Sequence, residues 1–288
     1  MTPILEIKNL RKDFKDFSLK NISFTLEKGF IMGFIGPNGA GKSTTIKLIM
    51  NLIKKDSGDI KVFGLDNIKN ENEIKNRIGF VYDENYFYEE LTISEMRGVI
   101  APLYRNWSNE DFNKYLKEFT LSPKKKIREL SKGMKMKFSL AVALSHQAEL
   151  IIMDEPTSGL DPIIRNELLD IFSYLIQDEN KGIFFSTHIT SDLDKIADYV
   201  TLIDNGEILF STTKDEILDC YGLVKGKKEF LNEHTRKNFI GVKENQFGFE
   251  GLAKNRDSIN KFIKEGIIIE KPSLEDVMLY FTRRELNV

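Results

Sequence analysis

Eight consecutive residues near the start of the chain read Gly36-Pro37-Asn38-Gly39-Ala40-Gly41-Lys42-Ser43. They match the pattern G-x-x-x-x-G-K-[ST], which is typical of loops that bind the phosphates of a nucleotide. An apolar run at 30–35 precedes the loop and suits a buried strand, and a helical pattern from Ser43 to Leu52 follows it. A glycine-rich turn before a helix can be purely structural, but the complete pattern in this context indicates a nucleotide site.

The loop combines two features that bind anions. Its glycines let successive N–H groups turn inward, and the helix N-terminus adds partial positive charge. We expect Lys42 to reach the β- and γ-phosphates and the Ser43 hydroxyl to hold Mg²⁺. The other expected nucleotide contacts are Gly36, Pro37, Asn38, Gly39, Ala40, Gly41 and Thr44.

The composition is that of a globular chain without a strong charge bias. It has 288 residues, 41% of them hydrophobic, and a formal net charge of −2. This length supports one main domain with a small appendage, and the mild acidity argues against a nucleic-acid partner. The single cysteine, Cys220, excludes an internal disulfide and favours a reducing compartment. Without a signal segment or a membrane-length apolar run, we expect a chain that is soluble by itself and meets a membrane through a partner.

Strand and helix patterns alternate over most of the chain. Leu5–Leu10 and Leu19–Leu26 alternate in part between apolar and polar residues, which predicts a half-buried antiparallel pair. Buried parallel strands are predicted at Phe30–Ile35, Leu150–Met153 and Ile183–Ser186. Helical patterns separate these strands, as in an α/β core. Residues of about 90–147 predict mostly helix, with Ser108 as one cap and an amphipathic helix at Ser131–Leu144, so we interpret them as an inserted helical subdomain.

The composition changes after Cys220. Glycines and lysines at 222–228 indicate a linker or an exposed hairpin. Later patterns predict strands at Phe239–Val242 and Phe247–Leu252, and helices at Asp257–Lys264 and Ser273–Thr282. Ser273 is the expected N-cap of the last helix. We therefore expect a small α+β appendage over residues 219–288.

A second motif reads Leu150-Ile151-Ile152-Met153-Asp154-Glu155 and ends a buried strand with two carboxylates. Ligand sites in open α/β sheets lie at the carboxyl ends of the strands. We expect Asp154 to bind Mg²⁺ directly or through water, and Glu155 to point at the water that attacks the γ-phosphate. A strand ending in a solvated acidic turn is the alternative, which the upstream phosphate loop disfavours.

Residues 1 to about 218 resemble, motif by motif and in the same order, the nucleotide-binding subunit of an ABC transporter. The stretch Leu130-Ser131-Lys132-Gly133-Met134 resembles the LSGGQ signature of that family, from which Lys132 and Met134 depart. Ser131 is expected to cap the following helix and Gly133 to leave room for close backbone approach, which makes a second anion site. An ordinary helix start is the alternative for this stretch alone.

Three further positions resemble functional residues of the family. Ser158–Asp161 resembles its D-loop, so Asp161 is an expected nucleotide contact. His188 resembles the switch histidine, which contacts the γ-phosphate and helps to hold the attacking water; simple surface exposure is the alternative. Phe14 resembles the aromatic residue that stacks on adenine, with Phe17 as the second candidate and core packing as the alternative for both.

One departure from the family lies after the predicted strand Ile78–Tyr82. The family usually has a glutamine there that links Mg²⁺ to the membrane partner, whereas this chain has Asp83. A carboxylate can also ligate Mg²⁺, although a plain loop acid is the alternative. The aromatic residues Tyr86–Tyr88 follow, where the family has a groove for a short helix of the membrane subunit. We expect this cluster to be split between that groove and the subdomain core.

The resemblance implies an α/β fold, namely a P-loop NTPase cassette of the ABC type. Such a cassette has a mixed-sheet core, an antiparallel β subdomain and a helical subdomain, here at about 84–147, and the appendage follows it. The resemblance also implies an ATPase that uses ATP and Mg²⁺, with Lys42, Glu155 and His188 as catalytic residues. Ser131 and Gly133 then act on the nucleotide held by a second copy or a homologous subunit. A transmembrane permease subunit at the cytoplasmic face of the cell membrane is the other implied partner.

The appendage resembles that of bacterial multidrug and peptide-export ATPases, so we expect an exporter of a peptide or an amphipathic toxic compound. A soluble ABC-type regulator acting on ribosomes or DNA is the alternative. A single phosphate loop and the lack of sustained heptads argue against it. A catalytically dead cassette conflicts with the presence of Lys42, Asp154, Glu155 and His188.

Overall fold

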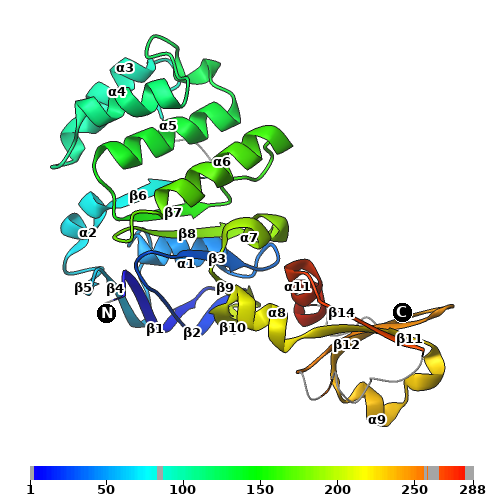
Figure 1. Cartoon of the computed structure of the whole chain (residues 1–288). Helices are drawn as coiled ribbons and strands as arrows, with labels where there is room; N and C mark the ends of the chain where they lie inside the picture. The colour runs from blue at the N-terminus through cyan, green and yellow to red at the C-terminus, as the bar shows by residue number, and fades with distance from the viewer. Residues whose placement is uncertain (1–2, 83–86, 256–257, 259–265, 283–288) are drawn as a thin grey trace.

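The computed structural model describes residues 3–82, 87–255, 258 and 266–282, which form three sheets with their helices (Figure 1). The strands are β1 (Leu5–Asp13), β2 (Ser18–Leu26), β3 (Ile31–Ile35), β4 (Ser57–Val62), β5 (Leu65–Asp66), β6 (Ile78–Val81), β7 (Leu150–Asp154), β8 (Gly182–Thr187), β9 (Tyr199–Asp204), β10 (Glu207–Thr213), β11 (Gly222–Gly226), β12 (Phe239–Asn245), β13 (Gly248–Ala253) and β14 (Ile267–Glu270). The α-helices are α1 (Lys42–Ile49), α2 (Glu71–Arg77), α3 (Ile93–Ile100), α4 (Asn109–Glu118), α5 (Lys132–Ser145), α6 (Pro162–Leu175), α7 (Thr190–Ile196), α8 (Lys214–Cys220), α9 (Glu233–Arg236) and α11 (Leu274–Thr282). Short 3-10 helices occupy Ala101–Leu103, Ile127–Glu129 and Lys228–Phe230.

The central sheet has the strand order β10-β9-β3-β8-β7-β6 and is parallel except at the β10 edge. The continuous apolar runs predicted β3, β7 and β8, and these strands are confirmed as almost wholly buried. Phe30, which the prediction included, lies before β3 and is exposed. Because parallel strands end at one edge, β3, β7 and β8 bring the phosphate loop, Asp154 and His188 to the same side of the sheet.

The predicted antiparallel pair is also confirmed. β1 and β2 pair from Leu5↔Leu26 to Asp13↔Ser18 and belong to a second sheet of order β2-β1-β4-β5. Helix α1 packs between this sheet and the central one, since Ile46 shares a hydrophobic core with Leu5 of β1 and Phe34 of β3. This packing fixes the direction in which α1 leaves the phosphate loop.

The helical subdomain is inserted between β6 and β7, which are neighbours in the central sheet, as the sequence predicted. Ser108 caps α4 by accepting a hydrogen bond from Asp111 N. Helix α5 differs from the prediction because it is not amphipathic along its whole length. All residues from Met136 to Ser145 are buried, since α5 contacts α4, α6 and β6. A helix enclosed in this way carries apolar residues on all sides.

The aromatic cluster at 86–88 is divided in the described residues. Phe87 packs edge-to-face on Phe138 of α5, with ring centroids 4.8 Å apart, whereas Tyr88 is 65% exposed. The core role is therefore confirmed for Phe87, whereas the groove role of Tyr88 stays a prediction. Tyr86 and the candidate metal ligand Asp83 lie outside the described residues.

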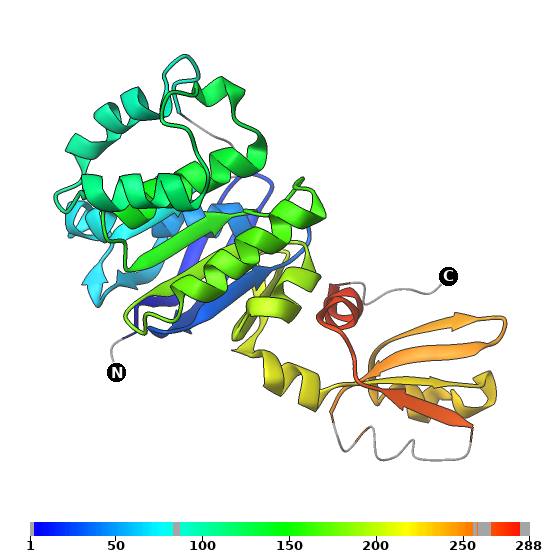
Figure 2. The same cartoon turned by 45° about the horizontal axis from the view of Figure 1, so that its top comes forward.

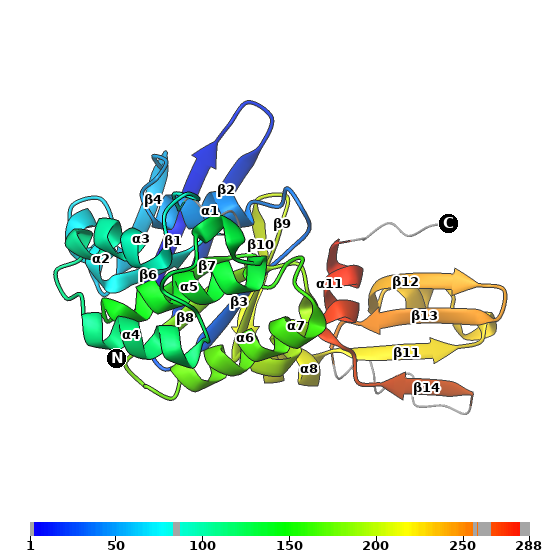
Figure 3. The same ribbon diagram turned by 90° about the horizontal axis from the view of Figure 1, so that it is seen from above.

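The appendage corrects one prediction. The segment Gly222–Gly226 is neither a linker nor an exposed hairpin but the inner strand β11 of an antiparallel sheet ordered β12-β13-β11-β14 (Figure 3). Its glycines and Lys225 suggested a turn. However, the side chains of Leu223 and Val224 are buried, as those of an inner strand are. The strands predicted at Phe239–Val242 and Phe247–Leu252 are confirmed as β12 and β13, which pair with each other, although Phe247 lies before β13. The predicted helix Asp257–Lys264, apart from Ser258, lies outside the described residues.

Helix α11 joins the appendage to the cassette, and Figure 2 shows it lying between the two (red). Ser273 accepts a hydrogen bond from Asp276 N, which confirms it as the N-cap. Val277 and Tyr280 are buried in the same hydrophobic core as Leu193 of α7. Within the described ranges, the structure contains no helix with the length and apolar character needed to cross a bilayer.

His146, which follows α5, makes the stability of the fold dependent on pH. Its ring is 1% exposed and stacks on Tyr104, with centroids 3.8 Å apart and an interplanar angle of 5°. Burial lowers the pKa of His146 from 6.5 to about 4, so the unfolded chain binds a proton at a higher pH than the folded chain. The contribution of His146 to the free energy of unfolding is therefore fully present above pH 6.5. It falls by about 3 kcal/mol as the pH drops towards 4.

We expect His146→Phe to remove most of this loss, as measured by urea unfolding at several pH values between 7 and 4. The difference between wild type and variant matters, because carboxylates also titrate at the acid end of this range. His234→Phe is the control, since His234 is exposed. A pH profile for His146→Phe that parallels the wild type would contradict the assignment.

Candidate active site

The phosphate loop follows β3 and ends at Gly41, the residue before α1. Gly36 faces β9 so closely that a Cβ there would lie 2.1 Å from the carbonyl oxygen of Ile203. Gly41 has a φ of +113°, in a region that L side chains rarely adopt. The two glycines of the motif are therefore required by the local backbone. The loop presents Asn38, Gly39 and Ser43 to solvent, as a phosphate cradle requires.

Lys42 is held inside this loop. Its side chain is 6% exposed, and its Nζ donates to the carbonyl oxygens of Gly36 at 2.8 Å and Pro37 at 3.2 Å. The same Nζ lies 3.5 Å from Oε1 of Glu155. The ammonium is thus fixed at the centre of the loop, beside the carboxylate that follows β7.

Asp154 and Glu155 are positioned by Ser186, a residue of β8 that the sequence did not single out. Its hydroxyl donates to Oδ1 of Asp154 at 2.5 Å. Glu155 N donates to both the carbonyl oxygen and the hydroxyl oxygen of Ser186, each at 3.1 Å. Glu155 has a φ of +49°, which costs a non-glycine residue about 1–2 kcal/mol. These hydrogen bonds hold it in that conformation and aim its side chain at the loop.

His188 lies next to Glu155, so that Lys42, Glu155 and His188 form a continuous row of contacting side chains. Its Nδ1 lies 2.8 Å from Oε2 of Glu155, and its backbone N donates to the same oxygen at 3.3 Å. The Glu155 side chain is 15% exposed, so its two oxygens face Lys42 and His188 in a partly dry environment. The structure therefore brings together all three residues predicted to be catalytic.

A buried network behind this row of side chains was missed by sequence reasoning. Thr157 donates to Oδ2 of Asp192 at 2.6 Å, and Arg165 Nε donates to Oδ1 of the same carboxylate at 2.5 Å. Asp192 is fully buried on α7, close behind His188 in the chain. The network joins the loop after Glu155 to α6 and α7. No local pattern indicates it, because its members are far apart in sequence.

The structure distinguishes the two aromatic candidates. Phe14 is 45% exposed between β1 and β2, whereas Phe17 packs against the loop, 2.9 Å from the position of a Cβ on Gly41. The rings of the two phenylalanines are 6.4 Å apart. Phe14 therefore keeps part of its ring accessible, with Nζ of Lys12 5.6 Å from the ring centroid, and Phe17 supports the loop.

We expect Phe14→Ala to weaken ATP binding at least about fivefold, because stacking of a base on an aromatic ring contributes ~1 kcal/mol or more. Calorimetric titration would measure this, with Phe247→Ala as the control because Phe247 is an 84% exposed phenylalanine of the appendage. The melting temperature of Phe247→Ala should equal that of the wild type, since little of the Phe247 ring is buried. Equal ATP affinity in Phe14→Ala and wild type would leave the base contact to another residue.

Ser131, Gly133 and Asp161 form a separate group. Ser131 caps α5 by accepting from Met134 N at 3.3 Å, as predicted. Asp161 caps α6 by accepting from Ile163 N and Ile164 N, each at 3.1 Å. Among the residues that the structure describes, no hydrogen bond or ion pair joins either side chain to Lys42, Glu155 or His188.

Gly133 was expected to leave room for close backbone approach at an anion site, and within this chain it packs against Ile164 of α6. A Cβ at Gly133 would lie 2.4 Å from Cγ2 of Ile164, so the glycine allows α5 and α6 to pack within this chain. Close to it, Nζ of Lys132 lies 3.8 Å from the Cβ position of Gly159. The start of α5 and the loop before α6 are therefore neighbours and present one common surface.

The comparisons with known proteins identify one family. A family model described as ABC transporter matches residues 19–158. The bacitracin transport ATP-binding protein BcrA of Bacillus licheniformis is 36% identical over 73% of this chain and 69% of its own length. The linearmycin resistance ATP-binding protein LnrL of Bacillus subtilis (strain 168) is 35% identical over 76% of this chain and 72% of its own length.

Solved structures give the same result. The ATP binding subunit of an ABC transporter superposes with a TM-score of 0.68 and 30% identity, covering 74% of this chain and 91% of that chain. A nucleotide-free ATP-binding cassette from an ABC transporter has a TM-score of 0.65 and 27% identity, covering 75% of this chain and 94% of that chain.

Proposed function

The chain belongs to the ATP-binding proteins of ABC transporters, which are ATPases coupled to transport, and from this premise we propose that Lys42, Glu155 and His188 carry out the hydrolysis. The family and the P-loop α/β fold expected from the motifs are confirmed. The proposal for the residues depends on one observation. The two oxygens of Glu155 lie 3.5 Å from Lys42 Nζ and 2.8 Å from His188 Nδ1.

This geometry supports a general-base mechanism without a covalent intermediate. Lys42 and the N–H groups of the loop stabilise the negative charge of the β- and γ-phosphates. Glu155 lies beside that ammonium and accepts a proton from water as the water oxygen bonds to the γ-phosphorus and the bond to ADP breaks. His188 fixes the direction of the carboxylate through its ring nitrogen and its backbone N–H.

Mg²⁺ fits the residues at this edge of the sheet. Within the described ranges there is no cluster of three or more His, Cys, Asp and Glu side chains that would hold a metal by itself. Mg²⁺ at a nucleotide site needs only one or two protein oxygens, because phosphates and water complete its shell. The exposed Ser43 hydroxyl and the Asp154 carboxylate are suitable ligands. The ion would neutralise charge on the β- and γ-phosphates, and Asp83 stays a prediction.

A second copy, or a homologous ATPase subunit, completes the site in our proposal. Ser131 and Asp161 lie on a common surface. Among the described residues of the same chain, neither side chain forms a hydrogen bond or ion pair with Lys42, Glu155 or His188. If two chains meet head to tail, the α5 N-terminus and this surface of one chain face the phosphate loop of the other. The helix N-terminus then adds a second source of partial positive charge at the nucleotide.

The membrane partner and the cargo are inferred from relatives. ABC transporter ATP-binding proteins work with membrane subunits, and we place this chain at the cytoplasmic face of the cell membrane with a transmembrane permease subunit. The similarity to a bacitracin transport protein and a linearmycin resistance protein supports export of a peptide or another amphipathic toxic compound.

The test combines partner capture with transport. The full chain, purified from detergent-solubilised membranes of its own cells, should carry a hydrophobic membrane protein. Membrane vesicles containing both subunits should move an amphipathic peptide antibiotic outward with respect to the cell in the presence of ATP. Vesicles with Glu155→Gln should not. Inward flux would contradict export, and recovery of ribosomes or nucleic acid in place of a membrane protein would favour the soluble regulator.

A further inference from the structure

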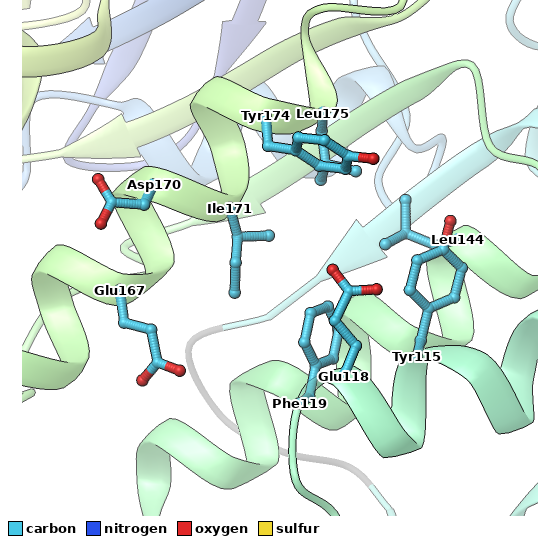
Figure 4. Close-up of a pocket in the computed structure, with 9 residues that line it drawn as sticks. All are labelled: Tyr115, Glu118, Phe119, Leu144, Glu167, Asp170, Ile171, Tyr174 and Leu175. Atoms are coloured by element: carbon cyan, nitrogen blue, oxygen red, sulfur yellow. The ribbon is translucent and has the colours of Figure 1, made fainter.

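A hollow of about 250 Å³ lies between α4, the C-terminal end of α5 and α6 (Figure 4). It shares no lining residue with the active site. Tyr115 comes from α4 and Phe119 directly follows it, whereas Ile171 and Tyr174 come from the facing helix α6. A molecule in this hollow would therefore contact both the helical subdomain and the helix that follows Asp161.

The walls of the hollow are apolar and aromatic. Phe119, Leu144 and Leu175 are buried and form its base. The Tyr115 ring stacks on Phe119, with centroids 5.9 Å apart and 27° between the planes, and Tyr174 is 62% exposed at the rim. Ring faces and edges are thus available from two helices.

The charges at the hollow are negative. Glu118, Glu167 and Asp170 line it, and Lys137 pairs with Glu167 at 2.5 Å. In the part of the chain that the structure describes, no hydrogen bond or ion pair engages the carboxylates of Glu118 and Asp170. Burial, together with the charges of Asp111 and Glu118, raises the pKa of the Tyr115 hydroxyl, which therefore stays neutral. The hollow carries two negative charges without a partner beside aromatic walls.

We propose that this hollow binds a small organic cation with an apolar body, such as an ammonium group on an aromatic or alkyl frame. An ammonium is attracted by both aromatic faces and carboxylates, and the apolar body covers the base formed by Phe119 and Leu175. An anion is repelled by Glu118 and Asp170. The volume is below the about 300–1,000 Å³ of sites for drug-sized ligands, which restricts the ligand to a small molecule.

The probe is 2-phenylethylammonium, titrated into the full chain and followed by the NMR signals of the Ile171 and Leu175 methyl groups. We expect saturable shifts at these methyls. The double variant Glu118→Gln/Asp170→Asn should bind at least about tenfold more weakly, because two charge-assisted contacts are lost. The matched control is Asp59→Asn/Glu233→Gln, which removes two exposed carboxylates outside the hollow and should bind as the wild type does.

A neutral probe and a second variant separate charge from shape. We expect 2-phenylethanol, which has nearly the same size, to bind at least about tenfold more weakly than the ammonium. Tyr174→Ala should weaken the ammonium about two- to fivefold, whereas Tyr88→Ala, a control of similar exposure, should not. Equal affinity for the two probes, equal loss in hollow and control variants, or no saturable shift at millimolar concentrations would each overturn the proposal.

Discussion

Replacing Glu155 with glutamine is expected to lower ATP turnover by at least about 100-fold, which is the smallest contribution usually found for a general base. Glutamine keeps the size of the side chain and cannot accept the proton of water. ATP binding should persist, because the loop and Lys42 are unchanged. The measurement is phosphate release at saturating ATP, at a chain concentration where the wild type is active, together with calorimetric titration of ATP.

Two comparisons make this result specific. Glu179→Gln changes an exposed glutamate between α6 and β8 and should leave turnover unchanged. His188→Ala should lower turnover less than Glu155→Gln does, because His188 orients the carboxylate that accepts the proton. Turnover of Glu155→Gln close to that of the wild type would remove Glu155 from the chemistry and would leave the base to another group.

The phosphate loop and the catalytic carboxylates could be predicted from the sequence because each motif is local. The loop, Asp154–Glu155 and His188 each follow a buried strand, and the carboxyl ends of parallel strands meet at one edge. Their chain order and periodicity therefore contained enough information to bring them together. The 2.8 Å contact between His188 and Glu155 is the outcome of that topology.

Features that depend on tertiary packing were not accessible in the same way. Ser186, Asp192 and Arg165 support the site through partners far away in the chain, and isolated polar residues give no pattern. β11 was misinterpreted because Gly222, Lys225 and Gly226 dominate its composition, while its only two apolar side chains, Leu223 and Val224, are buried in two different hydrophobic cores. Its strand conformation is decided by β13 and β14 on either side, which a local pattern does not contain.

The small size of Gly133 illustrates the same distinction. The motif predicted space for a ligand, whereas the structure places Ile164 of α6 against this glycine. A side chain at this position would separate α5 from α6 within one chain, whatever the nucleotide does. The expected role of Gly133 at a nucleotide therefore stays a prediction, and the structure adds that Ile164 also requires a glycine here.

Replacing Lys42 with alanine is expected to weaken ATP binding at least about tenfold, since a charge-assisted hydrogen bond to phosphate contributes roughly 1.5–3 kcal/mol. The substitution also removes the hydrogen bonds to Gly36 and Pro37 and the ion pair with Glu155. Turnover should be lost as well, because no ammonium then stabilises the negative charge on the β- and γ-phosphates during the reaction.

A second variant separates the charge from the packing of this buried side chain. Lys42→Met keeps most of the aliphatic stem and should bind ATP as weakly as Lys42→Ala does if the ammonium is responsible. Lys47→Ala, an exposed lysine on the same helix, should bind ATP as the wild type does. Calorimetric titration and melting temperatures decide between the outcomes. Full ATP affinity in either Lys42 variant, in a chain that still melts as the wild type, would mean that the phosphates bind elsewhere.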